Sequence, residues 1–199
     1  MYSLIQKPAP DFTADTVMQN GEFTKLTLSS FKDNKYVALF FYPLDFTFVC
    51  PSEIISFSNK VKEFEARDVQ ILGVSVDSKF SHFAWRNTHV DQGGIGNIHF
   101  PLVSDITKEI SRDYGVLVDD AVALRGTFLI DKKGIVRHAT LNDLPLGRNV
   151  DETLRIVDAM QHTEKYGEVC PAGWKKGEAA MKPTAAGVSS YLKEHAKTL

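Results

Sequence analysis

The residue with the clearest chemical potential is Cys50, which follows an apolar run and directly precedes Pro51. Because proline has no N–H and clashes with a preceding helical turn, Pro51 belongs to the first turn of a helix. Cys50 therefore lies at or beside the helix start, where unpaired backbone N–H groups and the helix dipole stabilise a thiolate. Since the thiolate is the nucleophilic form of cysteine, this position predicts a reactive thiol rather than an inert one.

Two residues upstream of Cys50 add to this prediction. Thr47 lies three positions earlier, so its hydroxyl can point at the sulfur or cap the helix. Pro43 fixes the chain as it leaves the preceding strand and can shield the sulfur from bulk water. Either residue alone is ordinary in a loop. Together, the pattern P-x-x-x-T-x-x-C at a strand-to-helix junction is a specific indication of thiol chemistry.

The cysteine and histidine content limits the other kinds of site. The chain has two cysteines, Cys50 and Cys170, and they form no C-x-x-C pair. None of the six histidines stands at metal-ligand spacing from either cysteine, so no metal site and no cofactor are expected. The missing C-x-x-C pair argues against a general thiol–disulfide oxidoreductase. A Cys–His hydrolase would need a histidine beside Cys50, which the sequence neither supports nor excludes.

Length and composition fit one domain with a short appendage, at 199 residues and an apolar fraction of 43%. A net charge of −2 gives no reason to expect nucleic acid or an anionic membrane as a partner. The sequence shows no apolar run of about 18 residues or more, so no membrane span is expected. Its N-terminus lacks the features of a secretory signal. We therefore expect a cytoplasmic protein, in a compartment that keeps thiols reduced.

The elements that must position Cys50 follow a strand–helix alternation. Apolar, β-branched and aromatic runs predict strands at 36–42, 69–77, 100–105, 126–131 and 135–141, with a hairpin turn at 131–134. Apolar residues at intervals of three and four predict helices over 54–64 and 106–114 and a longer helix that starts near 150 and ends at Gly167. A final helix is expected near 185–197. This order predicts an α/β fold in which helices flank a mixed central β-sheet.

The segment 167–184 breaks the alternation, because it is polar and contains three glycines and two prolines. We therefore expect a compact domain at residues 1–165 and a mobile C-terminal arm at residues 166–199. Cys170 belongs to this arm. An unused thiol in a flexible arm would be open to oxidation, so we expect Cys170 to have a chemical role.

Several tracts resemble one known family. PLDFTFVC (43–50) matches the P-x-x-x-(T/S)-x-x-C active-site motif of the peroxiredoxins, and FYPLDFTFVCPSEI resembles the typical two-cysteine subfamily. Further tracts that resemble this subfamily, in the same order, are GGIG (93–96), LRGTFLID (124–131), DLPLGRNVDETLR (143–155) and GEVCPAGW (167–174). The resemblance covers most of the chain and implies a thioredoxin-like fold.

The resemblance also implies a reaction. In this family the peroxidatic cysteine, by motif Cys50, reduces hydrogen peroxide or an alkyl hydroperoxide and becomes a sulfenic acid. The resolving cysteine of a second subunit, by motif Cys170, then forms a disulfide that thioredoxin or a similar dithiol carrier reduces. The family further implies a homodimer, assembled into a ring of five dimers, and a role in antioxidant defence.

Charged residues complete the expected site. Arg125 of LRGTF matches the active-site arginine of the family, and its guanidinium can stabilise the thiolate and grip a peroxide oxygen. Glu53, in the first turn after Cys50, can orient Arg125 or Arg148 by pairing with them, or it can be a surface carboxylate favoured by the helix dipole. The alternative hypothesis is a protein of the same fold that acts as a stress-induced holdase or signalling adaptor, with peroxidase activity as a secondary function.

Overall fold

The computed structural model describes residues 3–197 and 199, and it forms two compact units, Met1–Val150 and Asp151–Leu199. This grouping places almost all of α5 (Val150–Tyr166) in the C-terminal unit. The sequence had instead suggested a boundary at residue 165, after this helix. The difference concerns one helix and leaves the candidate site around Cys50 within the first unit.

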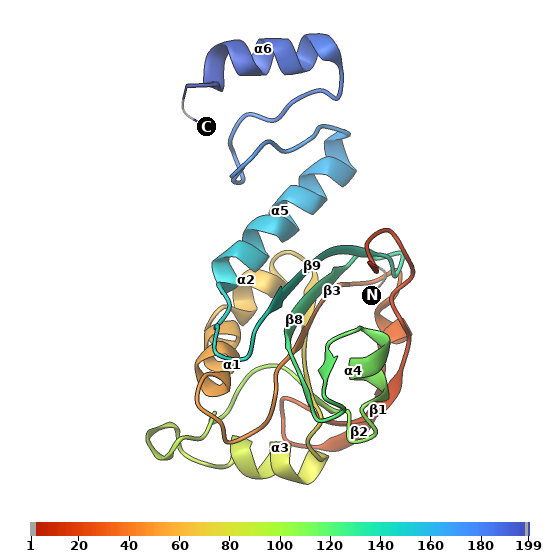
Figure 1. The fold of residues 1–199 in the computed structure, drawn as a ribbon, viewed down its shortest axis with the longest axis vertical. Coiled ribbons are helices and arrows are strands. Elements are labelled where there is room, and N and C mark those ends of the chain that lie inside the picture. Colours follow the sequence, from red (N-terminus) through yellow and green to blue (C-terminus); the bar gives the residue numbers. More distant parts are fainter. Residues whose placement is uncertain (1–2, 198) are drawn as a thin grey trace. The chain divides into compact units, whose positions relative to one another are not determined.

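A seven-stranded mixed sheet forms the centre of the first unit (Figure 1). The strand order is β2-β1-β5-β4-β3-β8-β9, in which β3, β4 and β5 run parallel and the other neighbours are antiparallel. The strands are β1 (Thr13–Val17), β2 (Phe23–Thr27), β3 (Tyr36–Phe41), β4 (Val69–Ser75), β5 (Leu102–Ser104), β8 (Arg125–Ile130) and β9 (Val136–Asn142). A separate pair comprises β6 (Leu117–Val118) and β7 (Val122–Ala123). All five predicted strands are confirmed, to within a few residues.

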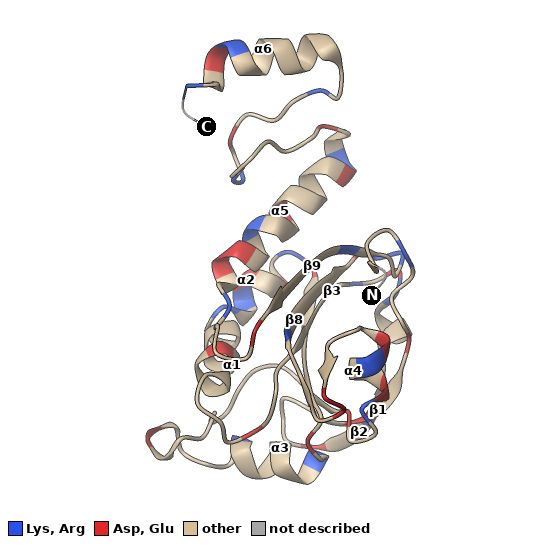
Figure 2. Cartoon of the chain, in the orientation of Figure 1, with Lys and Arg blue, Asp and Glu red and all other residues tan. Residues whose placement is uncertain are grey.

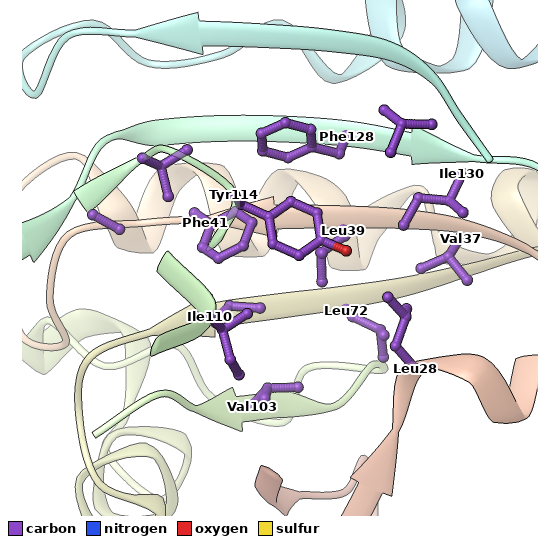
Figure 3. Close-up of a cluster of buried hydrophobic side chains, with 14 of the residues drawn as sticks. Leu28, Val37, Leu39, Phe41, Leu72, Val103, Ile110, Tyr114, Phe128 and Ile130 are labelled. Carbon is purple, nitrogen blue, oxygen red and sulfur yellow. The ribbon is translucent and has the colours of Figure 1, made fainter. Parts of the chain in front are cut away.

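The central strand β3 is buried on both faces, because successive side chains of a strand point to opposite sides. On one side the Phe40 ring stacks on Phe57 of α1 (Cys50–Asn59), with ring centroids 4.4 Å apart. On the other side Phe41 joins a cluster that includes Leu39, Tyr114 and Phe128 (Figure 3). This two-sided packing explains why the sequence of β3 is continuously apolar rather than alternating.

Two of the predicted helices differ from the expectation. The single helix expected over 54–64 is divided into α1 and α2 (Val61–Glu65), because Lys60 between them leaves helical geometry. The helix expected over 106–114 is shorter, α4 (Glu109–Asp113). Ile106 lies outside it and is 64% exposed, so its match to the apolar spacing was misleading.

Other elements of the first unit were not predicted. They are the hairpin of β1 and β2, the short pair of β6 and β7, the helix α3 (Lys79–Arg86), and the short 3-10 helices η1 (Leu28–Phe31) and η2 (Val90–Gln92). The helix α3 buries His82, Trp85 and Arg86, whereas its Phe80 is exposed. Two polar residues therefore share the buried face with Trp85, whereas Phe80 and Phe83 are exposed, so the apolar spacing of this helix does not mark its buried face.

The C-terminal unit contains α5 and α6 (Ala185–His195), joined by the segment that carries Cys170. Gly167 follows α5 with a φ of +66°, the left-handed conformation that commonly ends a helix. Thr184 is the N-cap of α6, and its hydroxyl accepts from the Gly187 N–H at 3.1 Å. None of the described residues of this helix is buried. The described part of this helix therefore adds little to a core, and the helix predicted near 185–197 is confirmed.

Acidic and basic residues are interspersed along each unit rather than gathered on one element (Figure 2). No helix among the described residues has the length and apolar character needed to cross a membrane.

Candidate active site

The structure places Cys50 at the first residue of α1, with Pro51 in the first turn as predicted. Val49 is the N-cap, and no side chain caps the helix, so Thr47 does not serve as its cap. The N–H groups of Ser52 and Glu53 in this first turn donate to the Val49 carbonyl oxygen, so the donors that contact the Cys50 sulfur come from side chains. Cys50 is fully buried, so its sulfur is surrounded by protein groups rather than by bulk water.

Thr47 contacts the sulfur directly. Its Oγ1 lies 2.9 Å from Cys50 Sγ and 2.8 Å from the carbonyl oxygen of Leu44. A hydroxyl has one hydrogen, so it donates fully to only one of these acceptors at a time. Pro43, which follows β3 after Tyr42, is buried at the start of this loop. The loop 43–49 therefore brings the predicted threonine to the predicted cysteine.

Arg125 approaches the same sulfur from β8, although it is distant in the sequence. Its Nη1 donates to Cys50 Sγ at 3.3 Å and to Glu53 Oε2 at 2.7 Å. Its Nε donates to the carbonyl oxygen of Leu144 at 2.7 Å. Three acceptors thus fix the guanidinium, and the structure brings this cation to the thiol that the sequence had singled out.

Glu53 is buried and pairs with both arginines, so it is not a surface carboxylate. Its Oε1 accepts from the backbone N–H and Nε of Arg148, and its Oε2 accepts from Nη2 of Arg148 as well as from Arg125. Burial lowers the pKa of Arg148, and the hydrogen bonds to Glu53 act against this shift. Two cations thus share one carboxylate, which leaves net positive charge beside Cys50.

A buried polar network beside the site was not identified from the sequence. The Asp45 carboxylate accepts from Tyr42 Oη at 2.8 Å and lies 2.8 Å from His82 Nδ1. The Asp45 backbone N–H donates to Asp77 Oδ2 at 2.9 Å. The only sequence signal was an aspartate inside the loop and another just after a strand. His82 is a paired core residue, and it contacts the Cys50 loop through Asp45.

Cys170 lies in the C-terminal unit and has a different environment. Its Sγ lies 3.6 Å from the carbonyl oxygen of Ala159 and 3.8 Å from Thr163 Oγ1. A carbonyl oxygen can only accept, so this contact suits the neutral thiol as a donor. The indole of Trp174 is buried and packs 4.8 Å from the His162 ring, which ties the segment to α5.

The geometry around Cys50 suits attack by sulfur on a small electrophile. Two donors, from Thr47 and Arg125, converge on Sγ, and both can hold negative charge that develops on an oxygen. Among the described residues, no group of three or more His, Cys, Asp or Glu side chains could hold a metal ion. The two donors at the Cys50 sulfur support nucleophilic thiol chemistry carried out by side chains.

Comparisons with known proteins agree with this chemistry. The chain matches the AhpC/TSA family over residues 5–139 and the C-terminal domain of 1-Cys peroxiredoxin over residues 159–194. It is 58% identical over 193 residues to alkyl hydroperoxide reductase C of Helicobacter pylori, with 96% of this chain and 98% of that protein covered. It is 55% identical over 191 residues to peroxiredoxin-1 of Gallus gallus, with 96% of each covered.

The fold agrees with a solved structure. The reduced 2-Cys peroxiredoxin of Plasmodium vivax superposes with a TM-score of 0.96 at 54% identity, covering 96% of this chain and 100% of that one. The expected thioredoxin-like fold is therefore confirmed. Because the matches extend over nearly the whole sequence, this chain belongs to the AhpC/TSA family, as a thiol peroxidase of the two-cysteine peroxiredoxin type.

Proposed function

We propose that the chain reduces hydrogen peroxide and organic hydroperoxides with Cys50 as the attacking thiol. The observation that carries this proposal is the convergence of Thr47 Oγ1 and Arg125 Nη1 on Cys50 Sγ. The thiolate attacks one peroxide oxygen, a sulfur–oxygen bond forms and the O–O bond breaks. The other oxygen leaves with a proton as water or alcohol, and Cys50 becomes a sulfenic acid.

Each neighbouring group has a role in this step. Arg125 holds its cation against the sulfur and stabilises the charge that moves onto the leaving oxygen. Thr47 offers a hydroxyl that can both donate and accept, which suits a hydroperoxide group, since that group carries both an O–H donor and acceptor oxygens. Glu53 and Arg148 keep Arg125 in place, and Pro43 starts the loop that carries Thr47. We assign Thr47, Pro43 and Arg125 to the site of the Cys50 reaction. Glu53 and Arg148 support that site.

We assign the resolving step to Cys170 of a second subunit. Its thiol attacks the Cys50 sulfenic acid, a disulfide forms and water leaves. Cys50 is fully buried in the first turn of α1, so this turn must unwind before another sulfur can reach it. Thioredoxin or a similar dithiol carrier then reduces the disulfide and is itself oxidised. The cycle serves antioxidant defence and redox homeostasis.

Two surfaces support an assembly. The strand β9 lies at the edge of the sheet, where a second copy can pair with it and form a homodimer. An aromatic cluster at α3, made of Phe23, Phe80 and Phe83, is exposed and suits a second contact between dimers. We propose that these contacts produce a ring of five dimers. We also place the protein in the cytoplasm, where a dithiol carrier is kept reduced.

The test treats the reduced protein with one equivalent of hydrogen peroxide, blocks free thiols and separates the products on a denaturing gel without reductant. We expect a covalent dimer, which is lost in Cys170→Ser while peroxide is still consumed. Cys50→Ser should lose both the dimer and the rapid consumption of peroxide. If Cys50→Ser still consumed peroxide at the original rate, the assignment of Cys50 would be wrong.

A further inference from the structure

One peptide group in the loop before Cys50 is held on both of its edges. The N–H of Asp45 donates to Asp77 Oδ2 at 2.9 Å. The C=O of Leu44, which belongs to the same peptide group, accepts from Thr47 Oγ1 at 2.8 Å. Because a peptide group is planar, its N–H and C=O directions cannot turn independently. The Asp77 carboxylate therefore sets the direction of the carbonyl that the Thr47 hydroxyl contacts.

Asp77 is itself well anchored, at the ends of two parallel strands. Its Oδ2 accepts from Ser75 Oγ at 2.6 Å, and its backbone N–H donates to the same Ser75 Oγ at 3.2 Å. Its carbonyl oxygen accepts from Ser104 Oγ, beside the end of β5, at 2.7 Å. The Asp77 carboxylate is thus fixed to the sheet, and it holds the 44–45 peptide group of the loop to that sheet.

The Asp45 side chain adds a second clamp on the same peptide group. Its carboxylate is 1% exposed, and it contacts Tyr42 and the fully buried His82. His82 Nε2 also lies 3.2 Å from the carbonyl oxygen of Val103. These contacts fix the Cα of Asp45, so a rotation of the 44–45 peptide could not be absorbed by a shift of the loop.

The orientation of this peptide matters for the reaction. With the observed orientation, Thr47 Oγ1 lies between the Leu44 carbonyl and Cys50 Sγ, 2.9 Å from the sulfur. If the peptide turned over, its carbonyl would face the Asp77 carboxylate and its N–H would face Thr47. The first contact would be repulsive, and the second would take an electron pair of the Thr47 oxygen. Asp77 disfavours this turned state.

We propose that Asp77 is a positioning residue for the peroxide reaction, acting through the 44–45 peptide group to place the Thr47 hydroxyl against Cys50. The proposal rests on the proposed function, since it concerns the same step. Asp77 touches neither the sulfur nor the peroxide. Its effect on the rate must therefore disappear when the Thr47 hydroxyl is absent.

A double-mutant cycle tests this dependence. The variants are Asp77→Ala, Thr47→Val and the double variant, and the readout is the rate constant of Cys50 oxidation, measured by competition for hydrogen peroxide with a haem peroxidase. We expect Asp77→Ala to lower the rate constant about tenfold, which is the effect expected from the loss of one well-placed hydrogen bond. In the Thr47→Val background the same change should lower it less than about twofold.

Two further variants separate positioning from stability. Asp77→Asn keeps an oxygen that can accept from Asp45 N–H and Ser75 Oγ, so it should recover most of the rate lost in Asp77→Ala. Asp105→Ala is the matched control, because Asp105 is also a buried carboxylate beyond a strand and accepts from two backbone N–H groups of α4. It should lower the melting temperature and change the rate constant less than about twofold.

The possible results are distinct. A tenfold loss that persists in the Thr47→Val background, or no loss in Asp77→Ala, would overturn the positioning role while leaving Cys50 as the attacking thiol. An equal loss in Asp105→Ala would also overturn it, by showing that general destabilisation slows the reaction. A wild-type protein whose Cys50 reacts slowly with peroxide would instead contradict the proposed function itself.

Discussion

The Glu53 carboxylate is bound by Arg148 through three donors, the backbone N–H at 2.9 Å, Nε at 2.8 Å and Nη2 at 2.9 Å. Arg148 also donates through Nη1 to the carbonyl oxygens of Phe41 and Gly126. This arginine thus ties α1, β3 and β8 to one another while it holds Glu53. Glu53 in turn holds Arg125 beside Cys50. The Glu53–Arg148 pair therefore connects the strands of the sheet to the site around Cys50.

The first prediction concerns this buried pair. In Glu53→Gln one charge is removed while two guanidinium groups remain buried, and an unpaired buried charge costs about 3 kcal/mol of stability. We expect a loss of this size in urea unfolding at fixed protein concentration. Glu63→Gln on the exposed surface of α2 is the control and should change stability by less than about 0.5 kcal/mol. Equal effects of the two changes would contradict the role of the pair.

The second prediction concerns the cation at the sulfur. Arg125→Met removes the donor to Cys50 Sγ, and the loss of one such preorganised donor should lower the rate constant for peroxide about a hundredfold. Arg125→Lys keeps a positive charge, but its ammonium group cannot contact Cys50, Glu53 and the Leu144 carbonyl oxygen together. Its rate constant should therefore lie between those of the wild type and Arg125→Met. The competition assay with a haem peroxidase measures both.

A matched variant tests whether the effect of Arg125 is specific. Arg112 is an exposed arginine of α4 that pairs with Asp120, also in the first unit. Arg112→Met should leave the rate constant within about twofold of the wild type, because it lies outside the residues that contact Cys50. A wild-type rate constant in Arg125→Met would show that the cation is dispensable for the reaction.

The sequence predicted the central part of the fold because local constraints there are strong. Five apolar strands are buried on both faces or pair with such strands, so their patterns are clear. Pro51 can occupy only the first turn of a helix, and this fixed the place of Cys50. Arg125 could not be found by local reasoning, because only the pairing of β3 with β8 brings it near Cys50. Arg125 was identified as a site residue only through the family resemblance.

Other features depend on contacts that a linear pattern does not contain. The helix α3 buries His82 and Arg86 through specific hydrogen bonds, beside the fully buried Trp85, and its exposed face carries Phe80. Asp77 reaches Asp45 only because the end of β4 lies beside the loop that follows β3. In the sequence these residues look like ordinary polar residues, because their contacts exist only once the parallel strands have paired.

The third prediction follows from the protonation of Asp77. Burial, and then the neighbouring Asp45 carboxylate, raise the pKa of Asp77 above its ordinary value. The folded state therefore binds this proton more tightly, and the stability that it contributes is lost as pH rises from about 3.9 through the raised value. Asp77→Asn has no such proton, so its stability relative to the wild type should be greater at pH 7 than at pH 4. Urea unfolding at both pH values measures the difference, and equal values would contradict it.

The last prediction concerns assembly through the aromatic cluster at α3. Phe80 is 66% exposed and contacts the Phe23 ring at 5.6 Å, so an apolar surface faces solvent in the isolated chain. A carboxylate placed there would have to be desolvated in any contact between dimers. If the protein forms the proposed ring of dimers, Phe80→Asp should shift the reduced protein to dimers in size-exclusion chromatography with light scattering, while the peroxide-induced covalent dimer still forms. Val90→Asp, at an exposed residue of η2, should leave the ring intact. An unchanged mass in Phe80→Asp would place the contact between dimers on another surface.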